Sequence, residues 1–292
     1  MSSIPSYNTL STPSQPSSPS PNVTVSPSAP FIPPGADEFS VMIWGPKSSG
    51  KTMFLYMLRD AMSNAKYMSK TDWTMRPDEA ASKFLNDLDE LKFSHYFSTP
   101  TPESTPEEMI FQFTCRDEYL KTELHRYLRV RDMPGEWLQG RADPVGRNVV
   151  DEYLRKCKGL LCLIDPNGKV EDTAKYFSKL LTRLQALCNK PTDKRLALCI
   201  TKMDERRHRE RREPPVTWAH SILGNTMTEI RETFLPTKIK CFFSSSVGMY
   251  PNYSPVRSNS GIDWQGKGII YKVVNIQPFG LVEPLCDWLF LD

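Results

Sequence analysis

The feature that most constrains this chain is the stretch WGPKSSGKTM, residues 44–53, directly after the apolar run FSVMI. Gly45, Gly50, Lys51 and Thr52 have the spacing of a phosphate-binding loop. Glycines let the backbone turn its amides inward, and a helix N-terminus attracts anions. We therefore expect this loop to bind a nucleotide, with the Lys51 ammonium at the terminal phosphates and the Thr52 hydroxyl on Mg²⁺. The other loop residues expected to contact the nucleotide are Lys47, Ser48 and Ser49.

Strand-like and helix-like segments alternate from Phe39 onward. Apolar runs predict strands at residues 39–44, 159–165, 195–200 and 240–246. Apolar residues at helical spacing predict helices at residues 52–64, 173–187, 218–234 and 281–291. Two further segments, 109–115 and 124–132, are predicted to pair as strands. The alternation predicts an α/β fold, a mostly parallel sheet with helices on both faces.

Two regions depart from this alternation. Residues 1–37 are dominated by Ser and Pro, and the first 36 contain no charged side chain. Such a segment buries too little apolar surface to offset its ordering entropy, so we predict a disordered tail before one domain, residues 38–292. Residues 66–108 form a polar insertion within that domain, with one helical segment at 78–91.

The bulk composition excludes several classes of protein. A net charge of +3 gives no strong signal for nucleic-acid binding. No apolar run approaches the roughly 20 residues of a transmembrane helix. The seven cysteines are dispersed without a Cys-x-x-Cys pair, which indicates reduced, mostly buried thiols rather than disulfides or a zinc site. We expect a cytoplasmic protein.

Magnesium beside the loop also needs a carboxylate at the end of a strand, and two aspartates compete. Asp165 ends the most apolar strand, which would suit an ATPase of the Walker type. Asp132 ends a half-polar strand and is followed by Met133, Pro134 and Gly135. These residues alone leave the choice open.

The sequence Thr201-Lys202-Met203-Asp204 follows the apolar strand RLALCI. It resembles the Asn/Thr-Lys-x-Asp element that reads guanine, in which the aspartate accepts hydrogen bonds from the ring N–H and the amino group of the base while the lysine stem covers it. Adenine offers no matching donors. Because a buried, unpaired carboxylate is costly, such a site rejects the wrong base by roughly 10⁴-fold.

The phosphate loop, the Asp-Met-Pro-Gly sequence and the Thr-Lys-Met-Asp sequence, in that order, resemble the translation-factor and Ras-like class of P-loop GTPases over roughly residues 38–246. The glutamate after Asp-x-x-Gly, the long insertion and the ending NIQPFGLVEPLCDWLF look more like the bacterial double-GTPase families. The resemblance implies that Asp132 holds Mg²⁺ and that the Gly135 amide meets the γ-phosphate. It also implies a small-residue loop at the guanine O6, for which the candidates are Ser244, Ser245 and Ser246.

The chain departs from the pattern of this class at three positions. Glu136 stands where many relatives use glutamine to position the attacking water. Glutamate can accept a proton from water but cannot donate an N–H to the γ-phosphate, so hydrolysis is slow or uses Glu136 as a base. Lys47 replaces a glycine and lies near the phosphates or points to solvent. Thr201 replaces the commoner asparagine.

The resemblance also implies a magnesium-sensing threonine shortly before the strand at residue 109. We expect Thr105, with Thr101 as the reserve. Arg141 and Arg147 are either an arginine finger within the chain or solvent-facing side chains.

Together these features predict a guanine-nucleotide-binding protein that hydrolyses GTP with Mg²⁺. It would act as a conformational switch for a protein effector or a related GTPase partner. Two alternatives stay open. The first is a non-catalytic nucleotide-binding scaffold, which Glu136 would suit, and the second is an ATP-dependent ATPase that uses Asp165.

Overall fold

The computed structural model describes ten stretches of the chain and two isolated residues, Pro33 and Gly35. The stretches are residues 39–63, 73–93, 108–117, 122–130, 144–188, 191–204, 213–248, 260–262, 268–270 and 278–291. All of them belong to one compact unit, Phe31–Asp292. Apart from Pro33 and Gly35, the predicted tail lies outside the described residues.

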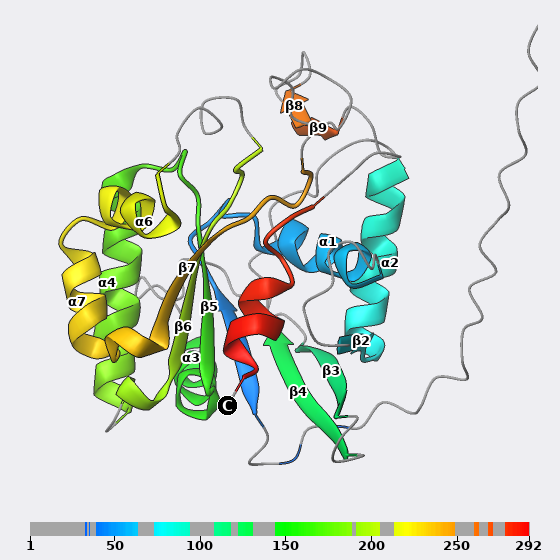
Figure 1. Cartoon of the computed structure of the whole chain (residues 1–292), viewed down its shortest axis with the longest axis horizontal. Helices are drawn as coiled ribbons and strands as arrows, with labels where there is room; N and C mark the ends of the chain where they lie inside the picture. The colour runs from blue at the N-terminus through cyan, green and yellow to red at the C-terminus, as the bar shows by residue number, and fades with distance from the viewer. Residues whose placement is uncertain are drawn as a thin grey trace, which may run out of the picture. The chain divides into compact units, whose positions relative to one another are not determined.

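The centre of this unit is a seven-stranded sheet with the order β2-β3-β4-β1-β5-β6-β7 (Figure 1). Strand β1 is parallel to its neighbours β4 and β5, and β6 and β7 continue the parallel run. Within this sheet β3 alone runs in the opposite direction, so it is antiparallel to both β2 and β4. The strands are β1 Ser40–Trp44, β2 Trp73–Pro77, β3 Met109–Asp117, β4 Thr122–Val130, β5 Gly159–Ile164, β6 Arg195–Ile200 and β7 Ile239–Phe243. The predicted α/β fold class is confirmed.

Helices cover both faces of this sheet, as predicted (Figure 1). They are α1 Lys51–Ser63, α2 Glu79–Phe93, α3 Pro144–Lys156, α4 Val170–Leu187, α6 Pro215–Leu223, α7 Thr226–Thr233 and a C-terminal π-helix, Leu285–Leu289. Short 3-10 turns occupy Pro191–Asp193 and Pro236–Lys238, and β8 Ser260–Ile262 pairs with β9 Gly268–Ile270 in a separate hairpin. Within the described part of the chain, no helix is both long and apolar enough to cross a membrane.

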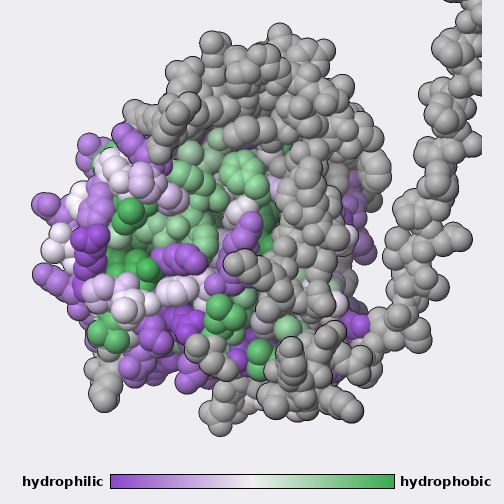
Figure 2. All heavy atoms as spheres, in the orientation of Figure 1, coloured by the Kyte–Doolittle hydropathy of each residue, from purple (hydrophilic) through white to green (hydrophobic). Residues whose placement is uncertain are grey.

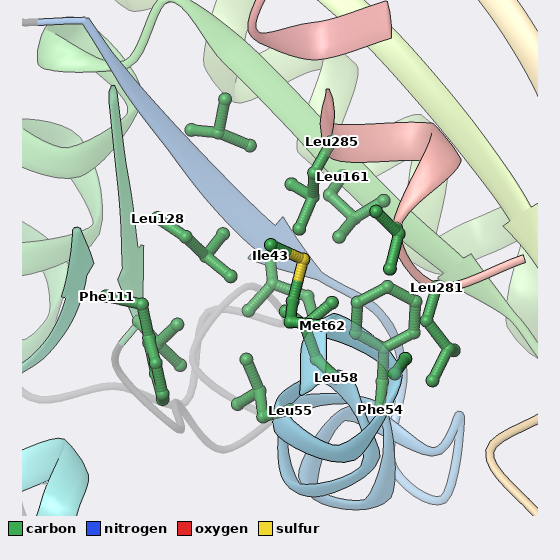
Figure 3. Packing of buried hydrophobic residues seen from close by; sticks show 14 of the residues in the cluster. Ile43, Phe54, Leu55, Leu58, Met62, Phe111, Leu128, Leu161, Leu281 and Leu285 are labelled. Atoms are coloured by element: carbon green, nitrogen blue, oxygen red, sulfur yellow. The ribbon is translucent and has the colours of Figure 1, made fainter. Parts of the chain in front are cut away.

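The period-2 alternation of the strands divides the core into two clusters. Val41 and Ile43 of β1 face α1, α2 and the C-terminal π-helix, whereas Met42 and Trp44 face α3, α4, α6 and α7. Figure 3 shows the first cluster, in which side chains of α1 pack on the sheet beneath the C-terminal segment. The α1 residues at the predicted helical spacing are Phe54, Leu55, Leu58 and Met62, and all are buried. On the other face, the outer surfaces of α4, α6 and α7 are mainly hydrophilic (Figure 2, left).

The structure corrects two predicted helices and adds elements that were not predicted. The polar insertion contains an edge strand, β2, as well as the predicted helix. The predicted helix 218–234 is two helices, because Gly224 takes φ +53° and ends α6. Helix α3 was not predicted. The last helix is the short π-helix rather than residues 281–291.

The insertion is attached to the sheet and to α1 by two aspartates. Asp78 accepts a 2.7 Å hydrogen bond from the Ala81 amide, as an N-cap does, and a 3.0 Å bond from the Ile110 amide of β3. Asp89 of α2 forms a two-pronged ion pair with Arg59 and accepts a 2.7 Å hydrogen bond from the Tyr56 hydroxyl. These contacts join α2 to the helix that follows the phosphate loop.

Candidate nucleotide-binding site

The loop from Gly45 to Thr52 connects the carboxyl end of β1 to the N-terminus of α1. Ser48 takes φ +63° and Gly50 takes φ +92°, and such backbone reversals form an anion-binding concavity of amides. A Cβ on Gly45 would overlap the Ser49 hydroxyl and lie 2.9 Å from the Leu163 carbonyl oxygen. Gly45 is therefore required because there is no space for a side chain, and Gly50 because its positive φ is unfavourable for a residue with a Cβ.

Lys51 folds back over the loop that it follows. Its ammonium donates to the Gly45 carbonyl at 2.8 Å and to the Pro46 carbonyl at 3.1 Å. Helix α1 begins at this lysine and carries no acidic residue in its first turn, so no carboxylate there opposes an anion. The half-buried Thr52 lies in the same turn, whereas Lys47 and Ser48 are exposed. This arrangement is suited to phosphate groups.

Two side chains from distant parts of the sequence support the loop from within the core. The Tyr176 hydroxyl of α4 accepts a 3.2 Å hydrogen bond from the Gly45 amide. Burial raises the pKa of Tyr176 well above its usual range, which keeps the hydroxyl protonated. The Thr201 hydroxyl lies 3.0 Å from the Ser49 carbonyl and 3.1 Å from the Ile164 carbonyl. Thr201 therefore links the phosphate loop to the loop after β6.

The predicted base-reading residues are brought together by the loops after β6 and β7. Asp204 is 2% exposed, and its Oδ1 accepts a 2.5 Å hydrogen bond from the Ser245 hydroxyl. That hydroxyl in turn accepts a 2.9 Å hydrogen bond from the Gly248 amide. Ser244 is buried and bonded through its backbone to Ile200 at 2.8 Å. Ser246 is half-buried.

The loop containing Ser245 is fixed by the end of the chain. Ser245 and Phe279 exchange backbone hydrogen bonds of 2.9 and 3.0 Å as an antiparallel bridge. Gly280 takes φ +63°, and a Cβ there would overlap the Phe243 carbonyl oxygen. The π-helix that follows is held by Arg195, which donates a 2.7 Å hydrogen bond to the Trp288 carbonyl.

Asp165, the rival magnesium ligand, is engaged in a different contact. Its Oδ2 lies 2.6 Å from the ammonium of Lys202, and its Oδ1 accepts a 2.9 Å hydrogen bond from the Asn167 amide. Lys202 takes φ +58°, and among the described non-glycine residues only Ser48 shares a positive φ. Backbone strain of this kind concentrates at functional sites. Here it occurs in the phosphate loop and in the predicted base loop.

Several predicted site residues lie outside the described residues. These are Thr101, Thr105, Asp132, Gly135, Glu136 and Arg141, and the side chain of Arg147 is likewise not described. Of the three predicted magnesium ligands, the structure therefore describes Thr52. Among the residues it describes, no group of three His, Cys, Asp or Glu side chains is placed to hold a metal ion.

The sequence did not reveal two of these contacts. Tyr176 lies at an apolar helical position, so its spacing indicates a core residue and gives no sign of its bond to Gly45. The pairing of Asp165 with Lys202 joins residues 37 positions apart. A carboxylate at the end of β5 was the available signal, and it was interpreted as a competing magnesium ligand.

The seven cysteines are all free. Burial raises the pKa of Cys157 and of Cys241 to about 11, and raises those of Cys162, Cys199 and Cys286 as well. Four of the seven, Cys157, Cys162, Cys199 and Cys286, are buried, and the other three are partly buried.

Two solved structures illustrate what this chain is similar to. One is the SRb-GTP/SRX complex of the signal recognition particle receptor from Chaetomium thermophilum, at 14% identity over 73% of this chain and 93% of that chain, with a TM-score of 0.38. The other is nucleolar GTP-binding protein 1 from Plasmodium falciparum, at 10% identity over 73% of this chain and 79% of that chain, with a TM-score of 0.39.

No curated protein matches this chain significantly. A family model does match it, the model of Double-GTPase 2, over residues 40–240. That span runs from β1 to β7 and contains the phosphate loop and the Thr-Lys-Met-Asp sequence. The resemblance to P-loop GTPases, and to double GTPases in particular, is confirmed. This chain belongs to the Double-GTPase 2 family.

Proposed function

We propose that this chain binds GTP and GDP and hydrolyses GTP with Mg²⁺. The observation that carries the proposal is the buried Asp204 carboxylate, oriented by Ser245 at 2.5 Å. Strands β1, β5, β6 and β7 are parallel, so the loop holding this carboxylate leaves the same edge of the sheet as the phosphate loop. A purine nucleotide bound by its phosphates would meet Asp204 with its base.

In this proposal each residue contacts a different part of the nucleotide. Asp204 accepts hydrogen bonds from the ring N–H and the amino group of guanine, and Lys202 covers the base with its stem. Lys51 and the loop amides stabilise negative charge on the transferred phosphoryl group. The remaining predicted contacts are those of Lys47, Ser48, Ser49, Gly135, Thr201, Ser244 and Ser246.

The half-buried Thr52 directly follows Lys51 in the first turn of α1, and we propose its hydroxyl as one magnesium ligand. Asp132 and Thr105 are the other two ligands that we propose. Mg²⁺ held by these residues would supply positive charge against the negative charge that develops on the phosphates. Glu136 would face the attacking water and either accept its proton or leave hydrolysis slow.

We further propose a switch. Loss of the γ-phosphate would release the segments around Thr105 and around Gly135 to Arg147, and a protein effector or a related GTPase would detect that change. The insertion adjoins the first of these segments in sequence and is joined to α1 through Asp89 and Arg59. We expect the insertion to help select the partner, and we expect the protein to act in the cytoplasm.

The test is competition of unlabelled GTP and ATP against a fluorescent GDP analogue on the full chain with Mg²⁺. We expect GTP to displace the probe at a concentration roughly 10³-fold or more below that of ATP, since adenine cannot satisfy the Asp204 carboxylate. Asp204→Ala should abolish this preference while thermal stability shows that the protein is folded. Equal displacement by GTP and ATP would refute the proposal and favour an ATPase.

Hydrolysis is tested separately, because binding alone would also suit a scaffold. Single-turnover conversion of GTP to GDP is measured for the wild type and for Glu136→Gln, with and without cell extract. Cleavage by the wild type supports the enzyme, and tight GTP binding without cleavage under either condition supports the scaffold.

A further inference from the structure

The carboxylate of Asp165 joins two loops of the candidate site. Asp165 follows the last residue of β5, Ile164, and its Oδ2 accepts a 2.6 Å hydrogen bond from the ammonium of Lys202. Its other oxygen, Oδ1, accepts a 2.9 Å hydrogen bond from the Asn167 amide. The Asp165 side chain is 9% exposed, whereas that of Lys202 is 35% exposed. The acid is therefore the more buried member of the pair, and the lysine side chain is partly exposed.

The backbone of Lys202 is held in an unfavourable conformation. Its φ of +58° lies in the left-handed region, which is costly for a residue with a Cβ. Backbone bonds on both sides maintain it: the Thr201 amide donates to Ile164 at 2.8 Å, and the Met203 amide donates to Ser244 at 3.2 Å. These backbone hydrogen bonds maintain the turn without the Asp165 side chain. The hydrogen bond between Asp165 and Lys202 therefore acts on the lysine side chain alone.

A purely structural explanation accounts poorly for this pair. An ion pair with one partly exposed member contributes little to stability, and a carboxylate that is 9% exposed pays a desolvation cost. Elsewhere in the chain, Arg183 and Asp151 join α4 to α3 at 2.5 Å and lie away from the loops of the site. The Asp165–Lys202 pair instead fixes the side chain that the base-reading sequence places against a purine.

We propose that Asp165 is a positioning residue for the guanine base. This inference rests on the proposed function, in which the stem of Lys202 covers one face of the base. By anchoring the ammonium, Asp165 holds the four-carbon stem extended before the nucleotide arrives, so less rotamer freedom is lost on binding. The stem contacts the face of the ring rather than its edge. Asp165 therefore strengthens base binding without reading which edge groups the base carries.

The test measures dissociation of a fluorescent GDP analogue from the full chain, together with the affinities for GDP and for IDP, which lacks the amino group of guanine. Asp165→Asn should accelerate dissociation by about 10-fold, the size of one charge-assisted contact. Its ratio of GDP to IDP affinity should equal that of the wild type. In the background of Lys202→Met, Asp165→Asn should have no further effect, because the anchored ammonium is already absent. Asp165→Glu should recover part of the loss.

The matched control is Asp151→Asn, which removes an ion-paired carboxylate between α3 and α4 and should leave dissociation unchanged. Unchanged dissociation from Asp165→Asn, additive effects in the double variant, or an altered GDP to IDP ratio would each overturn the inference. If Asp165→Asn fails to fold, Asp165→Glu and Lys202→Met give the same comparison. A wild type that binds no guanine nucleotide would instead refute the proposed function and this inference together.

Discussion

The Ser245 hydroxyl donates a 2.5 Å hydrogen bond to Oδ1 of Asp204, and the two residues are 1% and 2% exposed. Because the same hydroxyl accepts a hydrogen bond from the Gly248 amide, the proton of the hydroxyl is directed at the Asp204 carboxylate. A serine in the loop after β7 thus orients the acid in the loop after β6.

Replacement of this serine tests that relationship. In Ser245→Ala the buried Asp204 carboxylate and the Gly248 amide each lose a partner, so we expect the free energy of unfolding to fall by about 1–3 kcal/mol. GDP affinity should fall by about 10-fold, since the carboxylate is no longer held toward the base. Calorimetric titration and urea unfolding measure the two effects. Ser221→Ala, which removes a hydroxyl that bonds the Trp218 carbonyl within α6, should leave affinity unchanged.

The support of the phosphate loop by Tyr176 gives a second prediction. Tyr176→Phe removes the acceptor of the Gly45 amide, and a buried amide without a partner costs about 1–3 kcal/mol. We expect a lower melting temperature and weaker binding of both GDP and GTP, since the loop serves both. Tyr153→Phe alters a buried tyrosine of α3 instead and should not change nucleotide affinity. Equal affinities for wild type and Tyr176→Phe would contradict the supporting role.

The first glycine of the loop gives a third prediction. A methyl group on Gly45 would lie 2.9 Å from the Leu163 carbonyl, which belongs to the central strand β5 and cannot shift without disturbing the sheet. Gly45→Ala should destabilise the protein by about 1–3 kcal/mol and greatly weaken nucleotide binding. The comparison is Gly168→Ala, whose new methyl group would have its nearest neighbour at 3.3 Å. Similar melting temperatures for the two variants would show that the loop tolerates the methyl group.

The buried thiol of Cys157 predicts a dependence of stability on pH. Burial raises its pKa from 9.0 to about 11, against the opposing effect of Lys194. The folded state then keeps this proton where the unfolded state has lost it. The thiol's contribution to stability is therefore complete below pH 9 and is lost progressively as the pH rises toward 11. Urea unfolding at pH 7 and pH 10 should show a larger loss for the wild type than for Cys157→Ala.

The sequence predicted best those parts of the site whose determinants are local. The apolar residues of β1, the glycines at 45 and 50 and the spacing of Phe54 and Leu58 lie within one short stretch, and each acts through its own backbone or face. The apolar strands β5, β6 and β7 were recognised for the same reason. Their parallel order then brings Asp204 and Ser245 into contact.

The elements missed by the sequence depend on distant partners. Strand β2 has a single buried apolar residue, Trp73, and becomes a strand because β3 offers a free edge to pair with. The break at Gly224 requires a positive φ. A glycine permits this conformation, but its presence in the sequence does not predict that the helix ends there. The bond from Gly45 to Tyr176 spans 131 positions, and no local pattern encodes it.

The bridge between Ser245 and Phe279 has a consequence for the order in which the protein matures on the ribosome. The phosphate loop and α1 are complete at residue 63, whereas the loop that orients Asp204 needs Phe279 as its partner. The phosphate loop gains its contacts with Tyr176 and Thr201 once synthesis has passed residue 201, whereas Ser245 gains its bridge to Phe279 only later. A product that stops before Phe279 would lack the bridge that holds Ser245, and with it the support of the Asp204 carboxylate.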